Sequence, residues 1–201
     1  MTNLNEISTE SLAEELKARK DLLTADGLMP PPLYQLIAEI QVIPCVDGVA
    51  VRRNGERIEG MMIRRGTREF AGCLCSVGGK IRKLESMGDA LKRQFRTDLS
   101  CEIELLVPWN APVDVLQSAP VNEQGESLPG FGPEIGRHCV SNYYPVRLLG
   151  EPTKFGSTPF GGQEVLSVEW YDADNLPPES EFGYGQRSKV LSCILASETL
   201  I

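Results

Sequence analysis

Residues 79 to 101 read Gly79-Lys-Ile-Arg-Lys-Leu-Glu85-Ser-Met-Gly-Asp-Ala-Leu-Lys-Arg93-Gln94-Phe95-Arg96-Thr97-Asp98-Leu99-Ser100-Cys101, and this stretch decides the fold. A short apolar run enters a Gly-Gly turn, a loop follows, and Ser86 to Leu99 has the apolar spacing of an amphipathic helix. The glycines let the backbone approach a ligand closely. Positions 94, 97 and 98 share one face of the helix because they are three and four residues apart. Carboxylates on such a face would converge on one point, which is how a helix builds a Mg²⁺ site for a diphosphate.

This stretch resembles the Nudix box, G-x5-E-x7-R-E-U-x-E-E-x-G-U, in which U is an aliphatic residue. Gly79, Glu85 and Arg93 match at the correct spacings, and Asp98 stands at the second glutamate of the Glu-Glu pair. The departures are Gln94 and Thr97 for glutamates, Phe95 for the aliphatic residue and Ser100 for glycine. One of the three metal-facing carboxylates therefore remains.

The flanking residues strengthen the resemblance, which covers roughly residues 33 to 195. Ser76-Val-Gly-Gly79 resembles the strand end that precedes the box, and Lys80 is the basic residue that usually follows the glycines. Downstream, Glu164-x5-Trp170 resembles the glutamate that precedes an aromatic strand end in the family. The box with missing glutamates, and the entry strand Gln41 to Asp47, are most similar to the GDP-mannose mannosyl hydrolase branch.

The resemblance implies a site for a divalent cation, Mg²⁺ or Mn²⁺, and for a nucleotide or nucleotide sugar. The implied catalytic residues are Glu164, Asp47 and Asp98; the metal ligands Gly79, Asp98, Glu164 and Glu85; and the substrate-binding residues Arg64, Arg65, Lys80 and Arg93. In that branch the general base is a histidine near position 165, where this chain has Glu164 and Val165. Either Glu164 acts as the base, or the reaction differs, or there is none.

Each of these residues also has a purely structural interpretation. Glu85 and Arg93 could form a structural ion pair, and Glu164 could be a solvated loop residue. Asp98 lies near a helix C-terminus, where a negative charge opposes the helix dipole. Asp47 lies in an apolar strand, where a carboxylate needs a partner or a ligand. The arginines that include Arg64 and Arg65 could be a solvated face, and His138, the only histidine, reads better as structural than as catalytic.

The bulk composition describes an ordinary soluble domain. The chain has 201 residues, 41% hydrophobic and 24% charged, with a net charge of -8. That sign argues against binding along a nucleic-acid backbone or to an anionic membrane. No apolar stretch is long enough to span a membrane, and the polar N-terminus is not a secretory signal. Six cysteines without a Cys-x-x-Cys spacing indicate buried reduced thiols, not a zinc site, and a cytoplasmic location.

The pattern along the chain predicts a mixed α/β (α+β) Nudix fold, with a curved sheet between helices. An N-terminal helical extension, 1–32, is expected to precede a Nudix-like domain, 33–201. Helices are expected at 8–23, with a Ser11–Glu14 capping box, and at 33–40, 86–99 and 184–197. Strands are expected at 42–51, 58–63, 70–77, 102–107, 138–148 and 165–171, with an Asn54-Gly55 hairpin turn. Residues 108–136 are expected to form a long loop.

Two functions remain open at this point. One is a Mg²⁺-dependent hydrolase of a nucleoside diphosphate linked to another group, with a nucleotide sugar favoured. The other is a Nudix-fold module that has lost catalysis and binds a nucleotide or a protein. The N-terminal helices would otherwise expose their apolar stripe, so we expect a homodimer.

Overall fold

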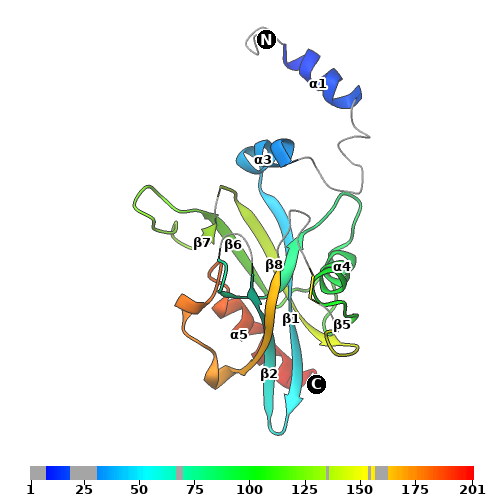
Figure 1. Cartoon of the computed structure of the whole chain (residues 1–201), viewed down its shortest axis with the longest axis vertical. Coiled ribbons are helices and arrows are strands. Elements are labelled where there is room, and N and C mark those ends of the chain that lie inside the picture. Colours follow the sequence, from blue (N-terminus) through cyan, green and yellow to red (C-terminus); the bar gives the residue numbers. More distant parts are fainter. Residues whose placement is uncertain (1–7, 19–30, 67–69, 135, 154, 157–162) are drawn as a thin grey trace. The chain divides into compact units, whose positions relative to one another are not determined.

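The structure is a computed structural model that describes residues 8–18, 31–66, 70–134, 136–153, 155–156 and 163–201 (Figure 1). The chain forms two compact units, Met1–Ile40 and Gln41–Ile201. None of the helices in the described ranges has the length and hydropathy that a membrane span requires.

The N-terminal unit contains the helices α1 (Thr9–Ala18) and α3 (Pro31–Ile40). The cap of α1 is Ser8, whose hydroxyl accepts a hydrogen bond from the Ser11 N–H at 3.1 Å. The expected capping box at Ser11 is therefore wrong, since the helix begins before that residue. Residues 19–23 of the expected helix lie outside the described residues. Pro31 opens α3, where the missing N–H of proline costs no helical hydrogen bond.

The second unit is built on one mixed sheet, as the sequence pattern predicts. The path of the sheet is β3-β2-β1-β8-β6-β7, while β4 pairs with β1, β5 with β8, and β9 with β2. The strands are β1 (Ile43–Asn54), β2 (Arg57–Arg65), β3 (Leu74–Cys75), β4 (Val77–Lys80), β5 (Ile103–Leu105), β6 (Asp114–Pro120), β7 (Gly132–Glu134), β8 (Cys139–Leu148) and β9 (Val165–Asp172). β1 runs parallel to β8 and antiparallel to β2 and β4.

Two helices cover opposite faces of this sheet, as Figure 1 shows: α4 (Met87–Leu99) and α5 (Arg187–Ala196). Strand geometry explains the division, because successive side chains point to opposite faces. A β-carbon on Gly48 would lie 2.8 Å from Phe95 of α4. On the other face, a β-carbon on Gly60 would lie 2.7 Å from Ile194 of α5. The short 3-10 helices η3 (Ala173–Asn175), η4 (Glu179–Glu181) and η5 (Ser197–Thr199) complete the unit.

The hairpin between β1 and β2 is confirmed, with Asn54 paired to Arg57 and Gly55 in the left-handed region at φ 61°. The expected long loop 108–136 is wrong in part, because it contains β6 and β7. The sequence signal of β6 is weak because, of its buried side chains, only Leu116 is a large apolar residue, whereas Ser118 and Ala119 are small. Its strand conformation depends on pairing with β8, from Asp114 opposite Tyr143 to Ser118 opposite Cys139.

Candidate functional site

The Gly78–Gly79 pair, which the sequence predicts as a turn, lies instead within strand β4, because it pairs antiparallel with β1: Gly78 is opposite Asp47 and Gly79 is opposite Val46. A β-carbon on Gly78 would lie 2.3 Å from Asp47 Oδ1 and 2.5 Å from the Val46 carbonyl oxygen. A β-carbon on Gly79 would lie 2.0 Å from Gln94 Nε2. Gly78 is required because its β-carbon would also meet the β1 backbone, whereas at Gly79 it would displace the Gln94 side chain. The β1 carboxylate and the α4 amide thus lie close to the same short piece of backbone.

Asp47 is buried, and both of its oxygens have hydroxyl partners. Oδ1 accepts from Ser76 Oγ at 2.6 Å, and Oδ2 accepts from Ser141 Oγ. Burial raises the pKa of Asp47, while the two serine hydroxyls and the charge of Arg65 act in the opposite direction. The partner that the sequence demanded for a carboxylate in an apolar strand is thus supplied by β8 and by the residue before β4.

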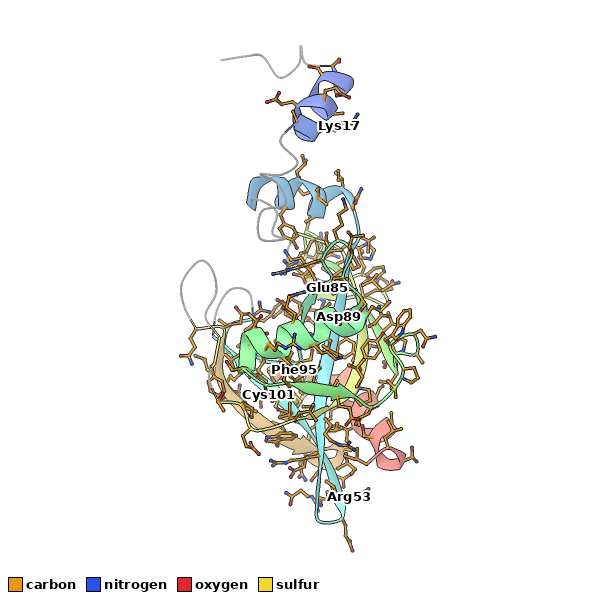
Figure 2. The ribbon with its side chains drawn as sticks, turned by 90° about the vertical axis from the view of Figure 1, so that its right-hand side faces the viewer. Lys17, Arg53, Glu85, Asp89, Phe95 and Cys101 are labelled. Carbon is orange, nitrogen blue, oxygen red and sulfur yellow. The ribbon has the colours of Figure 1, made fainter. Side chains whose placement is uncertain are left out.

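Glu85 and Arg93 face each other across the loop that leads into α4. Arg93 Nε and Nη2 donate to the two oxygens of Glu85 at 2.7 and 2.9 Å, and Nη2 also reaches the Lys80 carbonyl at 2.9 Å. The Arg82 N–H donates to Glu85 Oε2 at 2.9 Å. These bonds lower the pKa of Glu85, with the Arg93 hydrogen bond as the largest cause. Figure 2 shows Glu85 and Asp89 near the beginning of α4, with Phe95 and Cys101 toward and beyond its end.

Gln94 links α4 to the Gly78–Gly79 pair of β4. Its Nε2 donates to the Gly78 carbonyl at 2.7 Å, and its Oε1 accepts from Arg93 Nη1 at 2.5 Å. The amide therefore uses both of its ends within the box. The side chain of Gln94 thus joins the Gly78–Gly79 pair to α4.

Asp98 and Glu164 come from distant parts of the chain but are connected by backbone hydrogen bonds. The Gly156 N–H donates to the Asp98 carbonyl at 2.8 Å, and the Glu164 N–H donates to the Gly156 carbonyl at 3.0 Å. A β-carbon on Gly156 would lie 2.3 Å from the Thr97 carbonyl oxygen, so this close approach requires glycine. The residue at 156 therefore positions both carboxylates.

The Asp98 carboxylate is buried and accepts no hydrogen bond from any of the described residues. Burial and the negative charge of Glu164 raise the pKa of Asp98 to about 7, while Arg65 and Arg93 act to lower it. Within the described part of the chain, the Asp98 carboxylate therefore lacks a hydrogen-bond donor, which costs free energy unless a proton or a cation is present.

Arg65 lies at the centre of this group. Its Nη2 is 3.0 Å from Glu164 Oε1, its Nη1 donates to Tyr184 Oη at 2.5 Å, and its buried Nε has no hydrogen-bond partner among the described residues. Its charge also lowers the pKa of Asp47 and of Asp98. The structure thus gathers three of the predicted carboxylates, Asp47, Asp98 and Glu164, around one predicted arginine.

The other predicted residues lie in different surroundings. Arg64, the neighbour of Arg65 on β2, points to Glu169, with bonds of 2.6 and 2.9 Å, and to the Gly72 carbonyl at 2.7 Å. This pairing lowers the pKa of Glu169 to about 2. Lys80 has an exposed side chain at the end of β4. Arg64 is therefore engaged in an ion pair away from the Arg65 cluster.

Four residues of the site were not predicted from the sequence: Ser76, Ser141, Tyr184 and, as a partner of Gly78, Gln94. Tyr184 adopts φ 60°, which is uncommon for a bulky residue, and its ring packs on Phe70 with centroids 4.5 Å apart. Only Ser76 had a local signal, since it lies just before the Gly78–Gly79 pair. The other contacts depend on residues far away in the chain.

The described residues fit a divalent cation at one place only. No cluster of three His, Cys, Asp or Glu side chains in the described ranges has the geometry of a metal site. The oxygens of Glu85 are held by Arg93 and Arg82, and the Gly78 carbonyl is held by Gln94. The Asp98–Glu164 pair offers hard oxygen donors and excess negative charge, which suits Mg²⁺ or Mn²⁺ together with ligand oxygens and water.

The sequence matches no family model and no curated protein, whereas solved structures do match the fold. A possible asymmetric diadenosine tetraphosphate hydrolase from Jonesia denitrificans is 22% identical, with a TM-score of 0.60 over 80% of this chain and 97% of that one. The Nudix domain of Shewanella oneidensis NrtR, solved with ADP ribose, is 15% identical, with a TM-score of 0.51 over 80% and 90%. A MutT/Nudix family protein from Enterococcus faecalis is 11% identical, with a TM-score of 0.53 over 96% and 75%.

These similarities agree with the mixed sheet and with the helices on its two faces. The chain has the Nudix fold.

Proposed function

We propose that this protein hydrolyses a nucleoside diphosphate linked to a second group, with a nucleotide sugar as the favoured substrate, and that it uses one divalent cation. The observation that carries the proposal is the Asp98–Glu164 pair, in which the buried Asp98 carboxylate has no donor among the described residues. Burial and the charge of Glu164 raise the pKa of Asp98 to about 7. A pair of this kind would hold a cation or a transferable proton.

The residues around the pair have complementary tasks in this proposal. Arg65, with its buried Nε, would donate to a phosphate oxygen. Asp98 and Glu164 would hold the cation, which when bound neutralises diphosphate charge and favours ionisation of a water molecule. Before the cation binds, the Asp98 carboxyl, with its pKa of about 7, carries a proton for part of the time near neutral pH, and the cation would displace that proton. Asp47, held by Ser76 and Ser141, would stabilise positive charge on the sugar.

The compounds that two structural neighbours act on or bind support the substrate class. Diadenosine tetraphosphate and ADP ribose both contain an adenosine joined to a chain of at least two phosphates. The second group differs between them, so the shared chemistry is the nucleoside diphosphate.

The test is a panel of GDP-mannose, ADP-ribose and diadenosine tetraphosphate, incubated with Mg²⁺, Mn²⁺ or EDTA and separated by chromatography. We expect cation-dependent turnover of at least one compound, with a loss of at least about 100-fold in Asp98→Asn. Arg147→Lys, at an exposed ion pair, is the matched control and should retain activity. No turnover across the panel, together with no cation-dependent thermal shift, would refute the proposal.

A second candidate is a binding module without catalysis. The contacts of Glu85, Arg93 and Gln94 favour it, because these box side chains already hydrogen-bond to one another and to the backbone. Calorimetry with ADP-ribose or GDP-mannose in EDTA distinguishes the two functions. Binding of either compound without turnover in any cation would support the module.

We also propose that the protein is a cytoplasmic homodimer. The six cysteines are free thiols, four of them buried, which suits a reducing compartment. In α3, the side chains of Leu36 and Ile40 are 51% and 69% exposed, which would suit a second copy of the helix.

A further inference from the structure

The orientation of the Gln94 amide is determined by its two partners. The guanidinium of Arg93 can only donate, so the atom 2.5 Å from Nη1 must be the amide oxygen. The carbonyl of Gly78 can only accept, so the atom 2.7 Å from it must be the amide nitrogen. Glutamine satisfies both partners at once, because it carries a donor and an acceptor on one planar group.

A glutamate in the same place would satisfy only the arginine. Its second oxygen would face the Gly78 carbonyl oxygen, about where Nε2 now lies at 2.7 Å. Two oxygens at that distance are joined only by a shared proton or by a cation between them. The Gln94 amide packs directly against Gly79, because it fills the space that a β-carbon there would take, 2.0 Å from Nε2.

The neighbouring groups cannot replace this junction. Arg93 is already shared among Glu85, the Lys80 carbonyl and Gln94. The backbone N–H of Arg82 already donates a hydrogen bond to Glu85. Across β1, Asp47 Oδ1 comes close to Gly78 but is an acceptor as well. Within the described residues, the Gln94 amide is thus the side-chain group that joins the Gly78 carbonyl to α4.

We propose that Gln94 takes the place of a bound cation at this junction. Its amide fixes the Gly78–Gly79 pair of β4 to α4 in the free protein, and Gln94→Glu alone would convert the junction into a divalent-cation site. Gln94 is a positioning residue, because it contacts the Gly78 carbonyl and not the reacting atoms. The inference is independent of the Asp98–Glu164 pair and of hydrolysis, and it concerns a different carbonyl and a different side chain.

The experiment follows the thermal unfolding of the full chain in EDTA, Mg²⁺ or Mn²⁺. In EDTA, Gln94→Glu should unfold roughly 3–10 °C below the wild type, because a hydrogen bond is replaced by a repulsive contact. Mn²⁺ should restore most of this loss, and isothermal titration should show one binding event more than in the wild type. Gln124→Glu adds the same charge at an exposed turn and should show neither effect. Gln94→Met removes the donor without adding an oxygen and should be destabilised equally in EDTA and in Mn²⁺.

The readouts separate this inference from the proposed function. If the wild type has no cation response and no turnover but Gln94→Glu gains a cation response, the inference stands and the proposed hydrolysis fails. If Gln94→Glu is as stable as the wild type in EDTA, the inference is wrong. It is also wrong if the variant is destabilised, or unfolded by circular dichroism, to the same extent with and without Mn²⁺.

Discussion

Arg93 holds both oxygens of Glu85, with Nε at 2.7 Å from Oε1 and Nη2 at 2.9 Å from Oε2. The two side chains are 21% and 14% exposed, so water screens this pair much less than a surface pair. Glu85 and Arg93, eight residues apart, therefore form a structural ion pair that closes the box loop, and we call this pair the clasp.

Breaking this clasp should destabilise the free protein. Lysine cannot make the two parallel bonds of a guanidinium, so Arg93→Lys should lower the free energy of unfolding in EDTA by about 1.5–3 kcal/mol. Arg147→Lys is the matched control, because its pair with Glu104 is similarly short but about half exposed. It should change the free energy by less than about 0.5 kcal/mol. Urea titration measures both, and equal effects would contradict a clasp at Glu85.

The stability of the protein should depend on pH through Asp98. Its pKa is raised from 3.8 to about 7, first by burial and then by Glu164. A raised acid pKa means that the folded state binds the proton more tightly, so this contribution to stability is complete below pH 4 and is lost as pH rises to about 7. Asp98→Asn should therefore be more stable than the wild type at pH 8, by up to about 4 kcal/mol, and should gain little at pH 4.

A second variant tests the cause of that shift. Glu164→Gln removes the neighbouring negative charge and should lower the pKa of Asp98 toward its usual value, so the decline of stability should begin at a lower pH. Urea titrations at several pH values measure this. A wild type whose advantage over Asp98→Asn grows from pH 4 to pH 8 would contradict the sign.

Ser100 should be improvable by glycine. It ends α4 in the left-handed region, at φ 51° and ψ 38°, at the position where the Nudix box has glycine. Ser100→Gly relieves that backbone strain and should raise the free energy of unfolding by about 0.5–1 kcal/mol, after the greater chain entropy of glycine is included. Ser100→Ala keeps the strain and should give no gain. Equal stabilisation by both variants in urea titration would show that the backbone conformation is not the cause.

Two glycines of the box region should respond in opposite directions to alanine. Gly78→Ala would place a methyl group 2.3 Å from Asp47 Oδ1 and should cost about 1–3 kcal/mol. At Gly88, within α4, the nearest atoms would be 3.9 and 4.0 Å away, so Gly88→Ala should stabilise by about 0.5–1 kcal/mol. Thermal unfolding of the two variants decides the matter. Stabilisation by Gly78→Ala would mean that Gly78 does not approach Asp47 as closely as described.

The oligomeric state tests the proposed role of α3. Light scattering at micromolar concentration should give twice the mass of the chain for the wild type. Ile40→Lys places a charge on the exposed apolar stripe and should yield monomers. Leu149→Lys is the matched control, because that leucine is 59% exposed and lies outside the N-terminal unit. A monomeric wild type would overturn the proposal.

The local elements could be predicted because their signals are local. α4 follows from the spacing of Leu91, Phe95 and Leu99 together with a serine cap, and the β1–β2 hairpin follows from Asn54-Gly55. β6 could not be predicted in this way. Its buried positions include Ser118 and Ala119, which have no strong preference for strands, and its conformation is decided by pairing with β8.

The box frame by itself determined the Nudix fold, because Gly79, Glu85 and Arg93 lie in one strand end, one loop and one helix that follow each other directly, so that their spacing controls how they meet. Only the tertiary structure decided how the site is wired. Asp47 meets Ser141 across 94 residues, and Arg65 meets Glu164 because β2 pairs with the strand that follows that glutamate. Whether a buried carboxylate is paired, like Asp47, or lacks a donor, like Asp98, depends on which distant groups folding places beside it.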